Sequence, residues 1–113
     1  MANEAPSFVA FFGDGTRTFR SRPELIDELE RKTGRGISGL SKSLFSGDFR
    51  HAEMTETIRL ALVGGGETPE VAASLTAAYA ANRPIVEVLP LAVAILETAF
   101  FGKPAPETEG DEA

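Results

Sequence analysis

The sequence predicts an α+β fold that is mostly α-helical, with an N-terminal β-hairpin packed on a bundle of four to five helices. Residues 7–20 place aromatic and β-branched residues on both sides of a Gly-Asp-Gly sequence, which is typical of a hairpin. From residue 21 onward, apolar residues recur three and four positions apart between proline and glycine breaks, which is typical of amphipathic helices. A chain of 113 residues has room for one domain.

The expected hairpin joins residues 7–12 to residues 16–20 through an Asp-Gly turn, in which glycine supplies the positive φ. In the second strand, Arg17 and Phe19 share one face and alternate with Thr16 and Thr18. The first strand is apolar on both faces. It is therefore either covered on both sides or it offers one face to a partner.

Two helices should follow the hairpin. For the first we expect a capping box, in which Ser21 and Glu24 satisfy each other's backbone amides, and an end at Gly34. The second is short and ends at Gly47. Its apolar positions are Ile37, Leu40, Leu44 and Phe45.

A third helix is expected from about His51 to Val63, running into the triple glycine 64–66. Thr68 and Pro69 have the residue types of a helix cap and a first helical position, so a fourth helix should begin there. Its expected apolar stripe is Val71, Leu75, Ala78 and Tyr79.

The last helix is expected over residues 85–101 and is apolar almost all round, so it is either central to the bundle or partly covered by another molecule. Pro90 should kink this helix or mark its true start. Residues 1–6 and the acidic segment 103–113 are expected to be disordered, which leaves a single domain over residues 7–102.

Composition narrows the function classes. The chain has no cysteine, which excludes a disulfide framework and a thiolate metal site. It begins with no visible signal peptide, and its longest uncharged apolar run, residues 88–96, is well short of the roughly 20 residues that a membrane span needs. We therefore expect a cytoplasmic protein that makes no membrane contact, with association with a virion as an alternative.

The charge is unevenly distributed along the chain. The net charge is −6, but residues 16–50 carry eight basic and five acidic residues, while residues 51–113 carry three basic and ten acidic ones. Opposite charges on the two halves favour contacts with proteins, including contacts between copies of the chain. A homo-oligomer is therefore one expectation.

No group of residues points to catalysis or to a cofactor. His51 is the only histidine, and Glu53 and Glu56 do not share its helical face, so we expect a surface or capping residue. The triple glycine lacks the lysine of a phosphate loop, and a flexible or tightly turned interhelical link is the favoured interpretation. We therefore expect no enzyme, no metal and no cofactor.

One set of residues is compatible with nucleic acid, although no aromatic stacking platform or recognition helix accompanies it. Nucleic-acid binding is therefore the least favoured hypothesis for the function of this chain. The basic set is Arg17, Arg20, Arg22, Arg31, Lys32 and Arg35.

The remaining feature is an excess of apolar residues in the first strand and in the last helix, beyond what one small core clearly needs. Either a compact bundle covers all of them or some form a binding surface for a partner. The partner-binding hypothesis names Leu91, Ile95, Phe100 and Phe101.

The order of elements resembles a known family. The relevant segments are the hairpin, the helix with residues 25–30, the Gly-Ile-Ser-Gly-Leu segment 36–40, the leucine-rich residues 58–62 before the triple glycine, and the final helix ending at Gly102. Over residues 7–102 the chain resembles the small tail proteins of gene transfer agents, which are classed as tail assembly chaperones and sometimes labelled tail tube proteins.

The resemblance implies a role in building phage-like tails, without catalytic residues. The leading expectation is a tail assembly chaperone that binds the tape measure protein, with the tail tube protein as a further partner. The first alternative is a structural virion component, such as a tail tube or connector subunit. The second alternative is a small regulator that binds nucleic acid.

Overall fold

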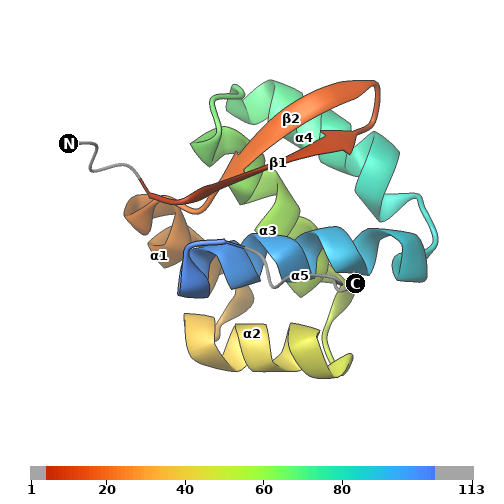
Figure 1. Cartoon of the computed structure of the whole chain (residues 1–113). Helices are drawn as coiled ribbons and strands as arrows, with labels where there is room; N and C mark the ends of the chain where they lie inside the picture. The colour runs from red at the N-terminus through yellow and green to blue at the C-terminus, as the bar shows by residue number, and fades with distance from the viewer. Residues whose placement is uncertain (1–4, 104–113) are drawn as a thin grey trace, which may run out of the picture.

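The computed structural model describes residues 5–103 and has the expected architecture, a two-stranded hairpin followed by helices (Figure 1). The expected disordered ends, residues 1–6 and 103–113, lie almost entirely outside the described residues. The elements in chain order are β1 (Ser7–Phe12), β2 (Gly15–Arg20), α1 (Pro23–Thr33), α2 (Ile37–Ser46), α3 (His51–Gly64), α4 (Pro69–Thr76), the π-helical turn η1 (Ala77–Ala81) and α5 (Ile85–Phe101).

The hairpin is antiparallel, with Phe8 opposite Phe19 and Phe12 opposite Gly15. Its turn is Gly13-Asp14 rather than the expected Asp14-Gly15, and Gly13 adopts the positive φ, at 73°. A positive φ at the first central residue alone is the pattern of a type II′ turn. Gly13 is also needed for space, because a Cβ at this position would lie 2.6 Å from the Tyr79 ring.

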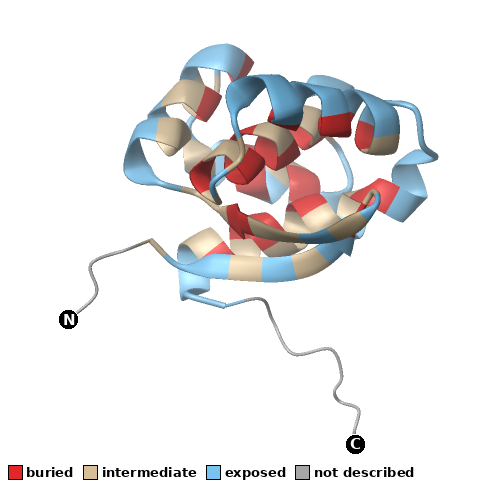
Figure 2. Cartoon of the chain, turned by 90° about the horizontal axis from the view of Figure 1, so that it is seen from above, coloured by how far each residue is buried: buried red, intermediate tan, exposed pale blue. Residues whose placement is uncertain are grey.

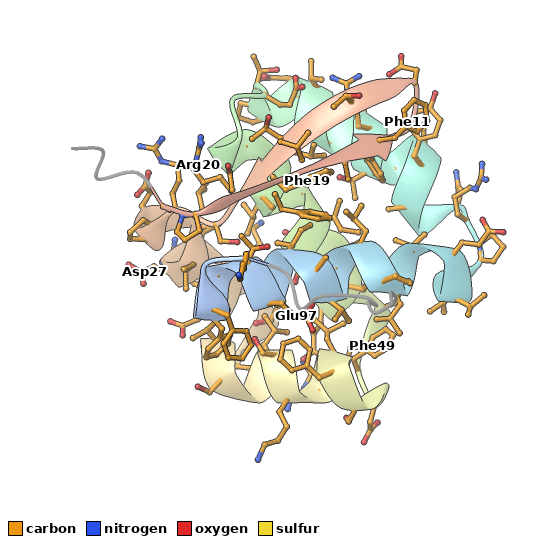
Figure 3. All side chains as sticks on the ribbon, viewed as in Figure 1. Phe11, Phe19, Arg20, Asp27, Phe49 and Glu97 are labelled. Carbon is orange, nitrogen blue, oxygen red and sulfur yellow. The ribbon has the colours of Figure 1, made fainter. Side chains whose placement is uncertain are left out.

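Helix α3 lies at the centre of the molecule and contacts β2 and each of the helices α1, α2, α4 and α5 (Figure 1). Met54, Ile58 and Leu62 recur at i, i+4 and i+8 along α3, and all three are fully buried. The hairpin covers one side of this core with Phe19, which is only 1% exposed and lies on the α5 side of the hairpin (Figure 3). The apolar period of residues 54–62 therefore predicted the central helix correctly.

The triple glycine brings the end of α3 against the backbone of β2. A Cβ at Gly64 would lie 1.9 Å from the Arg20 carbonyl oxygen, and a Cβ at Gly65 would lie 1.9 Å from the Thr18 carbonyl oxygen. Gly66 has a positive φ of 121°. The link expected at residues 64–66 is therefore a packing contact between a helix and a strand edge.

Two local expectations differ from the structure. Arg22, not Ser21, occupies the N-cap position of α1, and no side chain caps this helix. The Arg22 carbonyl accepts the amide hydrogens of Leu25 and Ile26, and the Glu24 carboxylate contacts the Arg22 side chain. Ser21 is thus one residue too early for a capping box, because Pro23 takes the first helical position.

The stripe expected on the fourth helix is displaced. Leu75 is buried and Tyr79 is half-buried as expected, but Val71 and Ala78 are exposed, and Ala72 and Ala80 are buried instead. The positions that are actually buried or half-buried recur three and four apart, at residues 72, 75, 76, 79 and 80, so the buried face is regular but begins one position later than expected. The cap was predicted correctly, because the Thr68 hydroxyl accepts a hydrogen bond from the Val71 amide at 3.1 Å.

Helix α5 occupies the expected residues and packs against α3, α2 and β1. Pro90 lies inside the helix and does not mark its start. The missing N–H of Pro90 leaves the Val86 carbonyl without its i+4 donor, and both residues are exposed, so water can serve this carbonyl. Figure 2 shows buried residues concentrated where the helices and the hairpin face one another.

Candidate partner-binding surface

Phe100 and Phe101 end α5 and form a small aromatic cluster at the surface. Their ring centroids are 6.0 Å apart, and the side chains are 45% and 70% exposed. Gly102 ends the helix here in a left-handed conformation, and its amide donates to the Thr98 carbonyl. The C-cap therefore fixes both rings at the edge of the bundle.

An open groove of about 470 Å³ lies between these rings and α2. Phe45 contributes the third ring and is 43% exposed, because it lies one position beyond the buried Leu44 on α2. The α2 residues that line the groove share one helical face, at i, i+3, i+4, i+7 and i+8. We call this surface the aromatic groove; its lining residues are Ser38, Ser41, Lys42, Phe45, Ser46, Phe100 and Phe101.

The four residues of the partner-binding hypothesis do not form one surface. Phe100 and Phe101 lie together in the aromatic groove. Ile95 is 2% exposed and belongs to the core. Leu91 is half-buried and lines a different groove, between α5 and the hairpin. Sequence reasoning named Phe45 only as an apolar position of the second helix and missed it as a surface residue, because the pairing of α2 with the end of α5 is not visible in local periodicity.

The second groove, which we call the strand groove, has a volume of about 500 Å³ and lies between β1 and α5. At one end Arg83 and Glu87 form an exposed ion pair with 3.5 Å between nitrogen and oxygen. The other lining side chains are uncharged. They include Phe8, Ala10, Phe12, Tyr79, Leu91 and Ala94.

The outer face of the hairpin is a third apolar area. Val9 is 58% exposed and Phe11 is 72% exposed, whereas their neighbours Phe8 and Phe12 face the core. Phe11 lies close to the hairpin turn, away from α1 (Figure 3). The first strand thus covers the core with one face and presents the other to solvent. The described residues of the chain therefore cover only one face of the strand, and a partner on the other face stays a prediction.

Four members of the basic set are paired with carboxylates of the same chain. Arg17 contacts both Asp14 and Glu67 at 2.7 Å, which joins the hairpin to the α3–α4 link. Arg35 contacts Glu53 at 2.7 Å. Arg22 and Arg31 pair with nearby carboxylates on α1, so four of the positive charges are balanced locally.

The Arg35–Glu53 pair contains the most buried charged group among the ion pairs described for residues 5–103, since the Glu53 side chain is only 1% exposed. Burial alone would raise the pKa of Glu53. Hydrogen bonds from the Arg35 side chain and from the Arg50 amide outweigh burial, so the pKa of Glu53 is lowered from its ordinary value. The pair joins the α1–α2 link to the start of α3 and is a structural contact.

His51 is exposed at the first position of α3, as expected. Among residues 5–103, no three histidine, aspartate or glutamate side chains gather closely enough to hold a metal ion. Within the same residues, no helix combines the length and the apolar character needed to cross a bilayer. What distinguishes the surface is therefore its apolar area, in the two grooves and on the hairpin.

Comparison with known proteins identifies the family. Neither a search of curated proteins nor a search of solved structures gave a match. The model of the family described as phage tail tube protein, GTA-gp10, matches residues 5–102. This match spans the hairpin and all the helices and agrees with the resemblance seen in the sequence. The chain therefore belongs to the GTA-gp10 phage tail tube protein family of gene transfer agents.

Proposed function

We propose that this protein is a non-enzymatic structural component of a phage-like tail, held in place by contacts with other tail proteins. The description of its family as a tail tube protein supports a place in the tail itself. The observation that carries the proposal is the aromatic groove, where Phe45, Phe100 and Phe101 remain exposed beside Lys42 and three serines. Apolar patches with a polar rim mark protein–protein contact sites.

A second candidate function is a tail assembly chaperone that binds the tape measure protein. The specific observation in its favour is the small amount of β-structure, since the described residues form a single two-stranded sheet. A subunit that closes a ring through its strands generally needs longer ones. An amphipathic helix of a partner can dock its apolar side chains into a groove such as the aromatic groove.

The composition of finished particles tests and separates these two functions. Particles are purified from cells that express the chain with its neighbouring tail genes, and the copy number of the chain per particle is measured by quantitative mass spectrometry. A structural component is present in fixed, multiple copies. A chaperone is absent from the particle, although its deletion abolishes tails. Normal tails in the deletion strain would contradict both functions.

The aromatic groove is tested with the double variant Phe100→Asp with Phe101→Asp. We expect this variant to fold but to lose tail formation, because two charges enter an apolar contact. Val86→Asp is the matched control, since Val86 is 78% exposed on the same helix and lies outside the groove. A pull-down with the tape measure protein shows whether the loss concerns this partner. Unchanged tail formation would remove the groove from the proposal.

A further inference from the structure

The hairpin has one edge that is covered by a helix and one edge, formed by β1, that is free. The carbonyl groups of Thr18 and Arg20 point from β2 toward Gly65 and Gly64 of α3, and therefore away from β1. The far edge of β2 is thus closed by a helix. In an antiparallel pair, two residues directly opposite each other either both point their N–H and C=O groups toward the partner strand or both point them away from it. Val9 is opposite Thr18 and Ser7 is opposite Arg20. Their N–H and C=O groups consequently point outward.

By the same alternation Phe11 also points its backbone groups outward, so Ser7, Val9 and Phe11 present three sets of N–H and C=O groups along one edge. No hydrogen bond described for residues 5–103 joins these groups to another element. The strand that follows the N-terminal trace in Figure 2 is the outer strand of the hairpin. This edge is therefore open for pairing with another strand.

The sequence of β1 has none of the residues that usually block pairing at an edge strand. Natural edge strands are usually blocked by a charged residue, a proline or a bulge, which prevents pairing with other chains. Residues 7–12 read Ser-Phe-Val-Ala-Phe-Phe, without charge or proline, and they pair with β2 in unbroken register. Val9 and Phe11 add exposed apolar surface along the strand, and Phe11 also lines the strand groove together with Phe8 and Ala10.

We propose that β1 pairs antiparallel with β1 of a second copy of this chain, which joins two hairpins into a four-stranded sheet. The self-complementary pattern of β1 favours a second copy as the occupant, because antiparallel pairing about Val9 places each outward-facing residue opposite another one. The chain carries a net charge of −6, so most faces of two copies repel, whereas β1 is uncharged and meets its own copy without repulsion.

The alternation fixes the register. Outward-facing residues must pair with outward-facing residues, and only an axis at Val9 pairs all three of them within the strand. Val9 then lies opposite Val9 of the second copy, and Ser7 lies opposite Phe11. The interface is one six-residue strand with a small apolar area, so we expect a weak dimer, with a Kd on the order of micromolar or above.

This pairing does not depend on the role in the tail, because the isolated chain can form it. The test measures the mass of the purified full chain by sedimentation equilibrium, from about 1 μM to about 1 mM, a range set by the expected affinity. The wild type should shift from monomer to dimer across this range. Val9→Lys and Val9→Glu should each weaken association by about tenfold or more, because two like charges meet at the axis.

A mixture of Val9→Lys and Val9→Glu should restore the dimer, because only a self-contact at residue 9 brings these two side chains together. Val71→Lys is the matched control and should associate like the wild type, since Val71 is 41% exposed on α4. Circular dichroism verifies that each variant is folded. A wild type that stays monomeric at about 1 mM, or a mixture without recovery, would overturn the proposal.

Discussion

At the scale of single residues, the Glu53 carboxylate is the polar group on which the fold depends most. It accepts hydrogen bonds from the Arg35 side chain at 2.7 Å and from the Arg50 amide at 2.9 Å, and it is almost fully buried. Replacing it with glutamine keeps the acceptor for the Arg50 amide but leaves the Arg35 charge without its partner. Arg35 is 34% exposed, so water compensates part of that loss.

We therefore expect Glu53→Gln to lower the free energy of unfolding by about 1–3 kcal/mol, below the cost of breaking a fully buried pair. Urea denaturation followed by circular dichroism measures this change. Glu87→Gln removes the same charge from an exposed ion pair with Arg83, and its effect should stay within about 0.5 kcal/mol. Equal effects of the two substitutions would contradict the structural role of Glu53.

The same carboxylate makes stability depend on pH. Its pKa is lower in the folded chain than the value of about 4.3 expected in an unfolded one. Its contribution is therefore complete above the unfolded pKa and is lost as the pH falls through the folded pKa. The free energy of unfolding of the wild type should decline below about pH 4.5, and the decline should be shallower in Glu53→Gln.

At the scale of elements, the contact between α3 and β2 depends on the absence of two side chains. Alanine normally stabilises a helix relative to glycine, but a Cβ at Gly64 would lie 1.9 Å from a backbone oxygen of β2. Either α3 or the hairpin must then move. We expect Gly64→Ala to lower the free energy of unfolding by about 2–4 kcal/mol.

Gly39 provides the opposite case on α2. It is exposed, and nothing lies within 4 Å of a Cβ built there. Gly39→Ala should therefore raise the free energy of unfolding by about 0.5–1 kcal/mol, the usual advantage of alanine in a helix. Thermal denaturation of both variants gives the comparison. A stabilising Gly64→Ala would show that α3 does not approach β2 as closely as described.

At the scale of the whole molecule, features encoded by neighbouring residues were predictable. Thr68 and Pro69 predicted the start of α4, and Gly47 and Gly102 predicted the ends of α2 and α5. These predictions were possible because helix caps depend on residue type at fixed positions. The family resemblance, which rested on element order and the triple glycine, is confirmed by the match over residues 5–102.

Features that depend on distant contacts were not predictable from one sequence. Gly64 and Gly65 are required by carbonyl groups of β2 more than 40 residues earlier in the chain. The aromatic groove arises only because α2 packs beside the end of α5, so the sequence did not show Phe45 as part of a surface with Phe100 and Phe101. The buried face of α4 begins at Ala72 instead of Val71, because the packing of α4 against α3 decides which side of the helix is covered.

The charge distribution of the folded molecule supports one further prediction, about nucleic acid. A basic segment binds DNA when its charges are free to replace the counterions of the phosphates. Here Arg17 and Arg35 are held by carboxylates from distant parts of the chain, and the net charge is −6. The positive half of the sequence is therefore largely neutralised in the fold.

We expect no binding to duplex DNA in electrophoretic mobility shifts at about 50 mM salt, where nonspecific binding of basic proteins is strong. Glu67→Gln and Glu53→Gln each remove one carboxylate partner of an arginine. They should produce little change, because Arg17 keeps Asp14 as a partner and the net charge stays negative. Tight binding by the wild type that weakens steeply with added salt would contradict this prediction. It would return the nucleic-acid hypothesis to consideration, with the basic half of the chain as its site.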